Sequence, residues 1–248
     1  KMTTDGVRTE YNPPAGMNAG RLAANPDGSI WVLGYTVSSP TSSYIGRIAS
    51  DGSIATYAVA GTNASFGGAT FAPDGSLWFG QREGTGVRMV RFLVNPGLTT
   101  QSLPSGSYRP TDNTYTGGYI WYLEQNINTG NSSVMGRVSP NGTVSSYTLG
   151  APVGTTNVTK RNQLVADTNG GLWFAGEGSS GAFLGRFDIS TQNISYYGLG
   201  YDNSMGRITI GDDGKVYYTA KDRGSGVTSL RSLDPATSTY ALVADYDR

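Results

Sequence analysis

The feature that most constrains the fold is a motif that recurs five times, at intervals of about 45 residues. An aromatic residue marks each copy, and the five markers are Trp31, Trp78, Trp121, Trp173 and Tyr217. An arginine within a short hydrophobic run follows each marker, and the five arginines are Arg47, Arg91, Arg137, Arg186 and Arg231. A period of this length predicts a repeat architecture in which each copy is one supersecondary unit.

Each copy has the composition of four short strands joined by turns. Asp-Gly or Gly-Gly precedes the aromatic marker, as in PDGSLW and TGGYIW, and such pairs favour hairpin turns that need positive φ angles. The flanking runs are rich in Val, Ile, Tyr, Trp and Thr and alternate in polarity, as half-buried strands do, and no segment has a helical period. Four strands in about 45 residues predict an all-β fold, a single β-propeller of four-stranded blades.

We expect five complete blades plus an extra N-terminal hairpin over residues 1–14, with six blades as the alternative. The expected blade limits are 21–62, 66–106, 109–154, 161–203 and 205–248. The extra hairpin would shield an edge, complete a sixth blade or belong to a longer array. The chain 1–248 is thus expected to form one propeller domain.

Composition excludes several classes of function. The chain contains no Cys and no His, which excludes disulfides, thiolate metal sites, cysteine nucleophiles and the Ser–His triad. Its 18 basic and 18 acidic residues cancel, so no broad positive field favours nucleic acid. No apolar run approaches the length of about 18 residues that a membrane span needs. No cofactor is predicted. A Ca²⁺ or Mg²⁺ ion in the channel is an open alternative that the sequence does not indicate, because oxygen ligands from several blades leave no sequence spacing.

The blade motif resembles that of the virginiamycin B (streptogramin) lyase-like propellers and their NHL and SMP-30 relatives. PDGSLWF, GRIASDG and a tyrosine-containing fourth strand carry this resemblance, which covers nearly the whole chain. It implies a scaffold whose lyase members have seven blades and open a lactone with histidines, a glutamate and Mg²⁺ on one face. Because this sequence has no histidine, those catalytic positions are not carried over and streptogramin lyase activity is not expected.

The topology of a four-stranded blade places the candidate binding residues on one face. The connections from second to third strand and from blade to blade lie on that face, and they are long here, as binding loops often are. The candidate ligand-binding residues are Arg21, Arg109, Arg161, Arg207, Glu83, Glu124, Glu177, Tyr35, Tyr115 and Tyr122.

Two chemistries are expected from these side chains. Guanidinium groups around the channel mouth would bind carboxylate, sulfate or phosphate groups, and tyrosine rings beside the long loops would stack on sugars. The alternative is a rim of solvated ion pairs, with tyrosines that cover sheet edges or pack between blades. The repeated arginines are expected to tie neighbouring blades together, and the tryptophans to lie in the core between blades.

These features favour a non-enzymatic recognition propeller that binds glycans, anionic ones included, as in an extracellular adhesin or a phage tail-fibre domain. The expected partner is a glycan or cell-surface polysaccharide, the expected location is extracellular or on a virion surface, and a longer chain or an oligomer is not excluded. One alternative is a polysaccharide lyase or glycoside hydrolase that uses Tyr, Arg and Glu without histidine. The other alternative is a protein-interaction scaffold.

Overall fold

The fold is known from a computed structural model, which describes residues 8–13, 16–38, 42–62, 64–84, 86–94, 97–103, 108–126, 129, 134–155, 158–200, 203–222 and 224–245. These residues form five antiparallel sheets of four strands each, and in every sheet the strands follow one another in chain order. Within these ranges there is no helix long and apolar enough to cross a membrane. The predicted all-β propeller of five complete blades is confirmed.

Each sheet is one blade. Blade 1 consists of β1 (Met17–Ala24), β2 (Ile30–Thr36), β3 (Ser42–Ile48) and β4 (Ile54–Thr62). Blade 2 consists of β5 (Ser65–Phe71), β6 (Leu77–Glu83), β7 (Gly86–Leu93) and β8 (Gly97–Ser102). Blade 3 consists of β9 (Tyr108–Thr116), β10 (Tyr119–Asn126), β11 (Val134–Val138) and β12 (Val144–Thr148). Blade 4 consists of β13 (Val158–Ala166), β14 (Gly171–Gly178), β15 (Gly181–Asp188) and β16 (Ile194–Gly200). Blade 5 consists of β17 (Asn203–Ile210), β18 (Val216–Asp222), β19 (Thr228–Asp234) and β20 (Thr239–Asp245).

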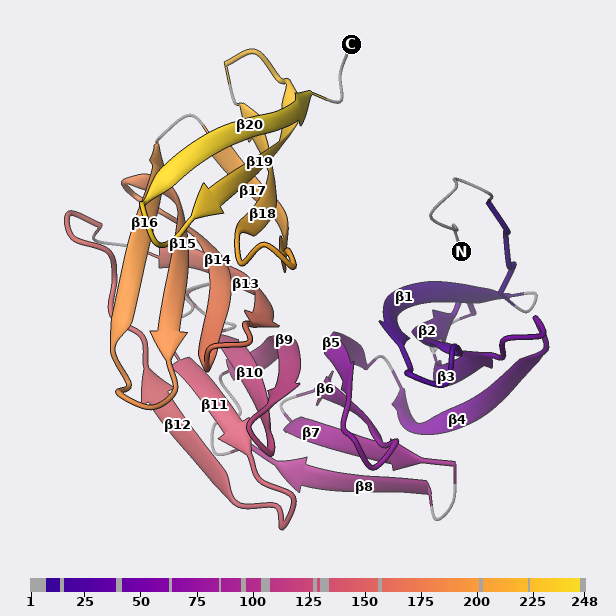
Figure 1. The fold of residues 1–248 in the computed structure, drawn as a ribbon. Helices are drawn as coiled ribbons and strands as arrows, with labels where there is room; N and C mark the ends of the chain where they lie inside the picture. Colours follow the sequence, from indigo (N-terminus) through magenta and orange to yellow (C-terminus); the bar gives the residue numbers. More distant parts are fainter. Residues whose placement is uncertain are drawn as a thin grey trace.

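The five blades lie side by side along an arc, with blades 1 and 5 at its two ends (Figure 1). The first strand of each blade lies towards the inside of the arc and the fourth strand towards the outside. The innermost strands of neighbouring blades contact one another, from β1 and β5 through to β13 and β17. Most of the hairpin predicted over residues 1–14 lies outside the described residues, so it stays a prediction.

The Asp-Gly-Ser-x-Trp sequence fixes the first hairpin of a blade through side-chain hydrogen bonds. In blade 1, Oδ1 of Asp27 accepts hydrogen bonds from the backbone N–H of Ser29 (2.8 Å) and from its hydroxyl. The same Ser29 Oγ accepts a hydrogen bond from Trp31 Nε1 (3.0 Å), and Oδ2 of Asp27 accepts one from Arg47 on β3 (3.3 Å). Gly28 supplies the positive φ of the turn (82°). One aspartate thus holds the turn, the tryptophan and the repeated arginine together.

This network corrects the role expected for the repeated arginines. Arg91 pairs with Asp74 (2.6 Å) and Arg186 with Asp167 (2.9 Å), in each case an aspartate in the first turn of the same blade. The first turn of blade 3 is Gly-Gly, and there the Arg137 guanidinium lies over aromatic rings of its own blade, the nearest ring centre at 4.4 Å. Among the described residues, the hydrogen bonds, ion pairs and ring contacts of these arginines all lie within their own blade, so these arginines stabilise individual blades.

Arg231 does not occupy the same structural position as the other four repeated arginines. Each of the other four lies opposite the tryptophan of its blade, whereas Arg231 lies opposite Tyr218 and its neighbour Ser232 lies opposite Tyr217. Successive side chains of a strand point to opposite faces. A difference of one residue therefore turns Arg231 to the face of blade 5 that meets blade 4.

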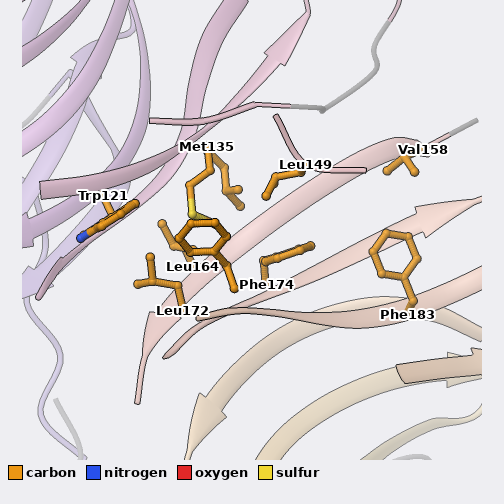
Figure 2. Packing of buried hydrophobic residues seen from close by; sticks show 10 residues of the cluster. Trp121, Met135, Leu149, Val158, Leu164, Leu172, Phe174 and Phe183 are labelled. Carbon is orange, nitrogen blue, oxygen red and sulfur yellow. The ribbon is translucent and has the colours of Figure 1, made fainter. Parts of the chain in front are cut away.

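Neighbouring blades pack through the second strands, whose alternate residues face the preceding and the following blade. Between blades 3 and 4, Trp121 and Leu123 pack with Leu172 and Phe174 in one cluster of buried side chains (Figure 2). All four tryptophans are buried in clusters that join two blades, so the prediction that they form the core is confirmed. Burial of such aromatic and aliphatic surface is the main favourable contribution to blade stacking.

Candidate functional site

The innermost strands place one residue of each blade at an equivalent position, which we call the axial ring. In the order of the blades, these residues are Arg21, Gly68, Asp112, Gln163 and Arg207. The pairing register shifts at or beside each of these positions. Such bulges kink a strand and redirect its side chains. The ring thus brings two arginines, an aspartate and a glutamine from four different blades to one level of the arc.

Asp112 connects blade 3 to its neighbours within this ring. Its Oδ2 accepts a hydrogen bond from the backbone N–H of Leu164 in blade 4 (2.9 Å), and its Oδ1 accepts one from Asn113 N–H (3.0 Å). The Asn113 side chain donates to a backbone carbonyl of blade 2 (2.9 Å). Burial raises the pKa of Asp112, and the hydrogen bonds and the positive charges of Arg21 and Arg207 oppose this rise. Charges from both ends of the arc therefore act on one carboxylate.

Glutamine side chains hold two of the candidate arginines. Oε1 of Gln125 accepts hydrogen bonds from Nε and Nη2 of Arg109 (3.1 and 2.7 Å), and Oε1 of Gln163 accepts one from Nη1 of Arg207 (2.8 Å). Gln163 has a positive φ (60°), which its position in a bulge explains. A neutral amide orients a guanidinium without cancelling its charge. Both arginines are exposed, and within the described part of the chain their guanidinium groups have no other hydrogen-bond partner, which leaves N–H groups for a ligand.

The remaining two candidate arginines lie on the innermost strands β1 and β13. Arg21 is partly buried, and its charge acts on Asp112. Arg161 lies on β13, but its side chain lies outside the described residues, so its predicted role stays a prediction. Of the four arginines predicted to bind a ligand, the structure therefore describes the side chains of three, which are Arg21, Arg109 and Arg207.

The loop edge, where second strands connect to third strands, holds the three predicted glutamates in three different settings. Glu83 accepts a hydrogen bond from Arg88 of its own blade (2.9 Å). Glu177 accepts one from the backbone N–H of Met205 in blade 5 (3.0 Å) and so joins two blades. The expected rim of ion pairs is thus present at Glu83 but does not extend to Arg109 and Arg207.

Glu124 is the exception, because it is buried and has no cationic partner among the residues that the structure describes. It is 5% exposed, and its Oε1 has no hydrogen-bond partner among the described residues. Burial raises the pKa of Glu124 to about 7. The Tyr122 hydroxyl is also buried without a described partner, and burial and the charge of Glu124 raise its pKa. These two groups lie inside the protein, away from a ligand that binds at the surface.

The three tyrosines predicted beside the loops do not share one place. Tyr35 lies near the end of β2 at the loop edge and is 41% exposed, as a sugar-stacking ring requires. Tyr122 packs in the core between blades 2 and 3, because its position on β10 points it towards blade 2. Tyr115 pairs with Ile120 beside the turn at Gly117 and Gly118, at the opposite edge of the blade. The predicted placement of Tyr115 and Tyr122 was therefore wrong.

Three polar residues at this site were not predicted from the sequence, namely Asp112, Gln125 and Gln163. An alignment of the innermost strands alone would have signalled two of them, since the segments GRL, GGA, TDN, NQL and GRI are equivalent in the five blades. Where a charged or amide side chain occupies a strand position that is small or apolar in other blades, polar groups are expected to line the axis of the propeller. Gln125 has no such signal, because its role depends on pairing with Arg109 across the sheet.

A family model decides the relationship of this chain to known proteins. The model of the virginiamycin B lyase family matches residues 1–228. The chain belongs to the virginiamycin B lyase family. Comparison with curated protein sequences gave no match.

Solved structures of this family and of other propellers share the fold. Virginiamycin B lyase from Staphylococcus aureus is 21% identical, with a TM-score of 0.73 over 98% of this chain and 75% of that chain. A catalytically inactive variant of that enzyme, with a histidine replaced by alanine and with quinupristin, is 16% identical, with a TM-score of 0.65 over 94% of this chain and 86% of that one. A chain of a nidogen–laminin complex is 16% identical, with a TM-score of 0.62 over 91% and 78%.

The resemblance to the virginiamycin B lyase family implied a Mg²⁺ ion on one face. Among the residues that the structure describes, no three Asp or Glu side chains gather as a metal site requires. A hard cation needs several oxygen ligands, and the carboxylates near the axis and the loop edge are instead engaged by N–H donors or buried singly. The described residues thus do not fit this ion.

Proposed function

We propose that this member of the virginiamycin B lyase family is a recognition propeller that binds an anionic glycan through Arg109 at the loop edge and Arg207 in the axial ring, without converting it. The observation that carries the proposal is the way in which Arg109 and Arg207 are held. Neutral glutamine oxygens orient both guanidinium groups, and neither is within ion-pair distance of a carboxylate among the described residues.

The contrast with the opposite edge supports this proposal. There, Arg47, Arg91 and Arg186 each pair with an aspartate of the first turn, which cancels their charge. A structural arginine gains stability from such pairing, whereas a ligand-binding arginine needs its charge and its outer N–H groups available. The chain has no net charge, so a local positive region at the loop edge would favour acidic ligands over neutral ones.

The ligand class follows from the groups beside the arginines. Carboxylates and sulfates match the planar fork of a guanidinium, and both are common on acidic polysaccharides. The exposed ring of Tyr35 offers a surface for the apolar side of a sugar. Acidic polysaccharides of this kind are common on cell surfaces, so we predict that this protein is extracellular or lies on a virion surface.

Lyase activity on a streptogramin is not what we propose, although relatives carry that name. The relative with a histidine replaced by alanine is described as catalytically inactive. The 248 residues of this chain contain no histidine that could serve as its counterpart.

Polysaccharide cleavage by carboxylates is also less well supported than binding. A hydrolase needs two accessible carboxyl groups that face one substrate. Glu83 is paired with Arg88, Glu177 is bonded to the backbone of blade 5, and Glu124 is buried. A raised pKa such as that of Glu124 suits a general acid, but its carboxyl group would have to reach a substrate.

A protein-binding role, as in the nidogen–laminin relative, would be favoured by a continuous apolar surface at the loop edge. The large exposed apolar side chains near this edge are Tyr35 and Val37 of blade 1 and Val153 after blade 3. Blade 2 lies between blades 1 and 3 (Figure 1), so side chains of blade 1 and of the segment after blade 3 are not neighbours, and this alternative has less support than glycan binding.

A glycan array that includes carboxylated, sulfated and neutral glycans tests the proposal, probed with and without Ca²⁺. We expect binding to a group of acidic glycans that is lost in the double variant Arg109→Gln, Arg207→Gln. The matched control is Arg91→Gln, which removes the same charge at the opposite edge and should leave binding intact. Binding that is equal in the double variant, or confined to neutral glycans, would contradict the proposal.

A further inference from the structure

A pocket of about 570 Å³ lies between blades 4 and 5, on the outer side of the arc. Its wall includes Leu199 from the outermost strand of blade 4 and residues of β18, β19 and β20 from blade 5. We call it the Arg231 pocket, after the one arginine in its lining. Its volume is within the range of about 300–1,000 Å³ that is typical of small-molecule sites.

The positive charge of this pocket belongs to Arg231, which faces the pocket because of the one-residue register difference in blade 5. Arg231 faces blade 4 because it lies one position away from the site of the other repeated arginines. Its Nε donates a hydrogen bond to Ser229 Oγ (2.9 Å), and Ser229 is buried, so this contact fixes the guanidinium. Among the described residues, its Nη atoms have no hydrogen-bond partner and no carboxylate within 4.0 Å. An oriented guanidinium with free N–H groups is suited to a carboxylate.

Aromatic and aliphatic surface lies beside this charge. Tyr240 and Leu242 line the pocket and are 45% and 61% exposed, although both are large apolar side chains. Tyr218 forms another part of the wall, and burial raises its pKa to about 12, so its hydroxyl stays protonated at neutral pH. Exposed rings of this kind bind planar or cyclic groups at a low entropic cost.

The rim of the pocket limits the charge that a ligand can carry. Asp222 and Asp245 both line it, and Oδ1 of Asp222 accepts hydrogen bonds from the backbone N–H and hydroxyl of Ser225 (2.6 and 2.8 Å). These bonds, with a smaller contribution from the charge of Arg231, hold the pKa of Asp222 below its usual value, so it remains negative. The two carboxylates beside Arg231 disfavour dianions such as phosphate relative to a ligand with a single carboxylate.

We propose that the Arg231 pocket binds a small monoanion that carries its carboxylate on a ring, with the carboxylate on Arg231 and the ring against Tyr240 and Leu242. Sugar acids and aromatic acids share this chemistry. The site lies on the outer strands, apart from the axial ring and the loop edge, and the proposal does not depend on glycan binding there.

Saturation-transfer NMR with the whole chain tests the proposal, with galacturonate, benzoate and neutral methyl galactoside as probes. We expect transfer to galacturonate, to benzoate or to both, and little to the neutral sugar. The Arg231→Gln variant should weaken binding by about tenfold or more, as loss of a charge-assisted hydrogen bond does. Any transfer to these acids through Arg109 and Arg207 is removed in the double variant Arg109→Gln, Arg207→Gln, which should still bind the acids through Arg231.

A second variant keeps the test decisive if Arg231→Gln folds poorly. Leu242→Asp changes an exposed position and brings a negative charge to the pocket, so it should also abolish binding of the acid. Failure of both acids to bind would overturn the proposal, as would unchanged binding in Leu242→Asp or in a folded Arg231→Gln variant. Equal transfer to all three probes would overturn it too, since it would show that Arg231 gives no selectivity.

Discussion

Replacement of Glu124 by glutamine should change how the stability of the protein depends on pH. The carboxyl group is 5% exposed and has an unpartnered oxygen, and burial raises its pKa from the ordinary value of 4.5 to about 7. Between these two pH values the folded state keeps a proton that the unfolded state has released. Raising the pH therefore removes stability from the wild type, and the Glu124→Gln variant cannot show this loss because its amide does not titrate.

The expected magnitude follows from the size of the pKa difference. A pKa difference of one unit corresponds to 1.36 kcal/mol, so ionisation of buried Glu124 costs about 3.4 kcal/mol in full. About 2.5 kcal/mol of this cost develops between pH 5 and pH 8. The free energy of unfolding of Glu124→Gln, relative to wild type, should therefore rise by about 2.5 kcal/mol over that interval.

Urea denaturation of both proteins at several pH values from 5 to 8, followed by tryptophan fluorescence, measures this difference. Glu83→Gln is the matched control, since it removes a glutamate of blade 2 that is about one-third exposed and paired with Arg88. A surface pair of that kind contributes less than about 1 kcal/mol. Parallel pH profiles for wild type and Glu124→Gln would refute the reasoning, because they would mean that Glu124 is already ionised in the folded state at pH 5.

Two further predictions concern the construction of the blades. A Cβ at Gly185 would overlap the ring of buried Phe174, so Gly185→Ala should lower the free energy of unfolding by about 1–3 kcal/mol. Gly198→Ala is the control and should have a much smaller effect, because a Cβ at Gly198 would meet open space. Equal denaturation midpoints of the two variants would contradict this prediction. Arg186→Gln removes two ion pairs and should destabilise the protein by about 1–3 kcal/mol. Arg231→Gln should change the free energy of unfolding by less than about 0.5 kcal/mol. A larger loss for Arg231→Gln in thermal unfolding would show that Arg231 has a structural role.

The fold could be predicted from the sequence because a blade is a local structure. The turn signal, the alternation of polarity and the aromatic marker all lie within a short segment, and their recurrence reveals the propeller. The burial of Trp31 and Trp173 followed from the same repetition, since a large apolar residue at one position of every blade must face a neighbouring blade. No long-range information was needed for these conclusions.

The site was harder to predict because its contacts cross between blades and depend on register. The bond from Leu164 N–H to Asp112 joins residues 52 positions apart, and nothing in either segment indicates it. Arg231 lies in a run that resembles the other arginine runs, but a register difference of one residue turns its side chain to the opposite face. The surface position predicted for Tyr122 was wrong for a related reason. Tyr122 is near a loop in the sequence, but this did not reveal that its side chain points from β10 into the core.

The proposed role of Arg109, at the loop edge, and Arg207, in the axial ring, is to bind an acidic glycan through charges that no neighbouring carboxylate pairs among the described residues. Calorimetric titration of an oligogalacturonide into the wild type, the double variant Arg109→Gln, Arg207→Gln and the Arg91→Gln control tests it most directly. Each lost charge-assisted contact should weaken binding by about tenfold or more, so the dissociation constant of the double variant should rise by at least about 100-fold, and that of the control should not change. A dissociation constant that is the same in the wild type and the double variant, or no heat of binding in the wild type, would contradict the claim.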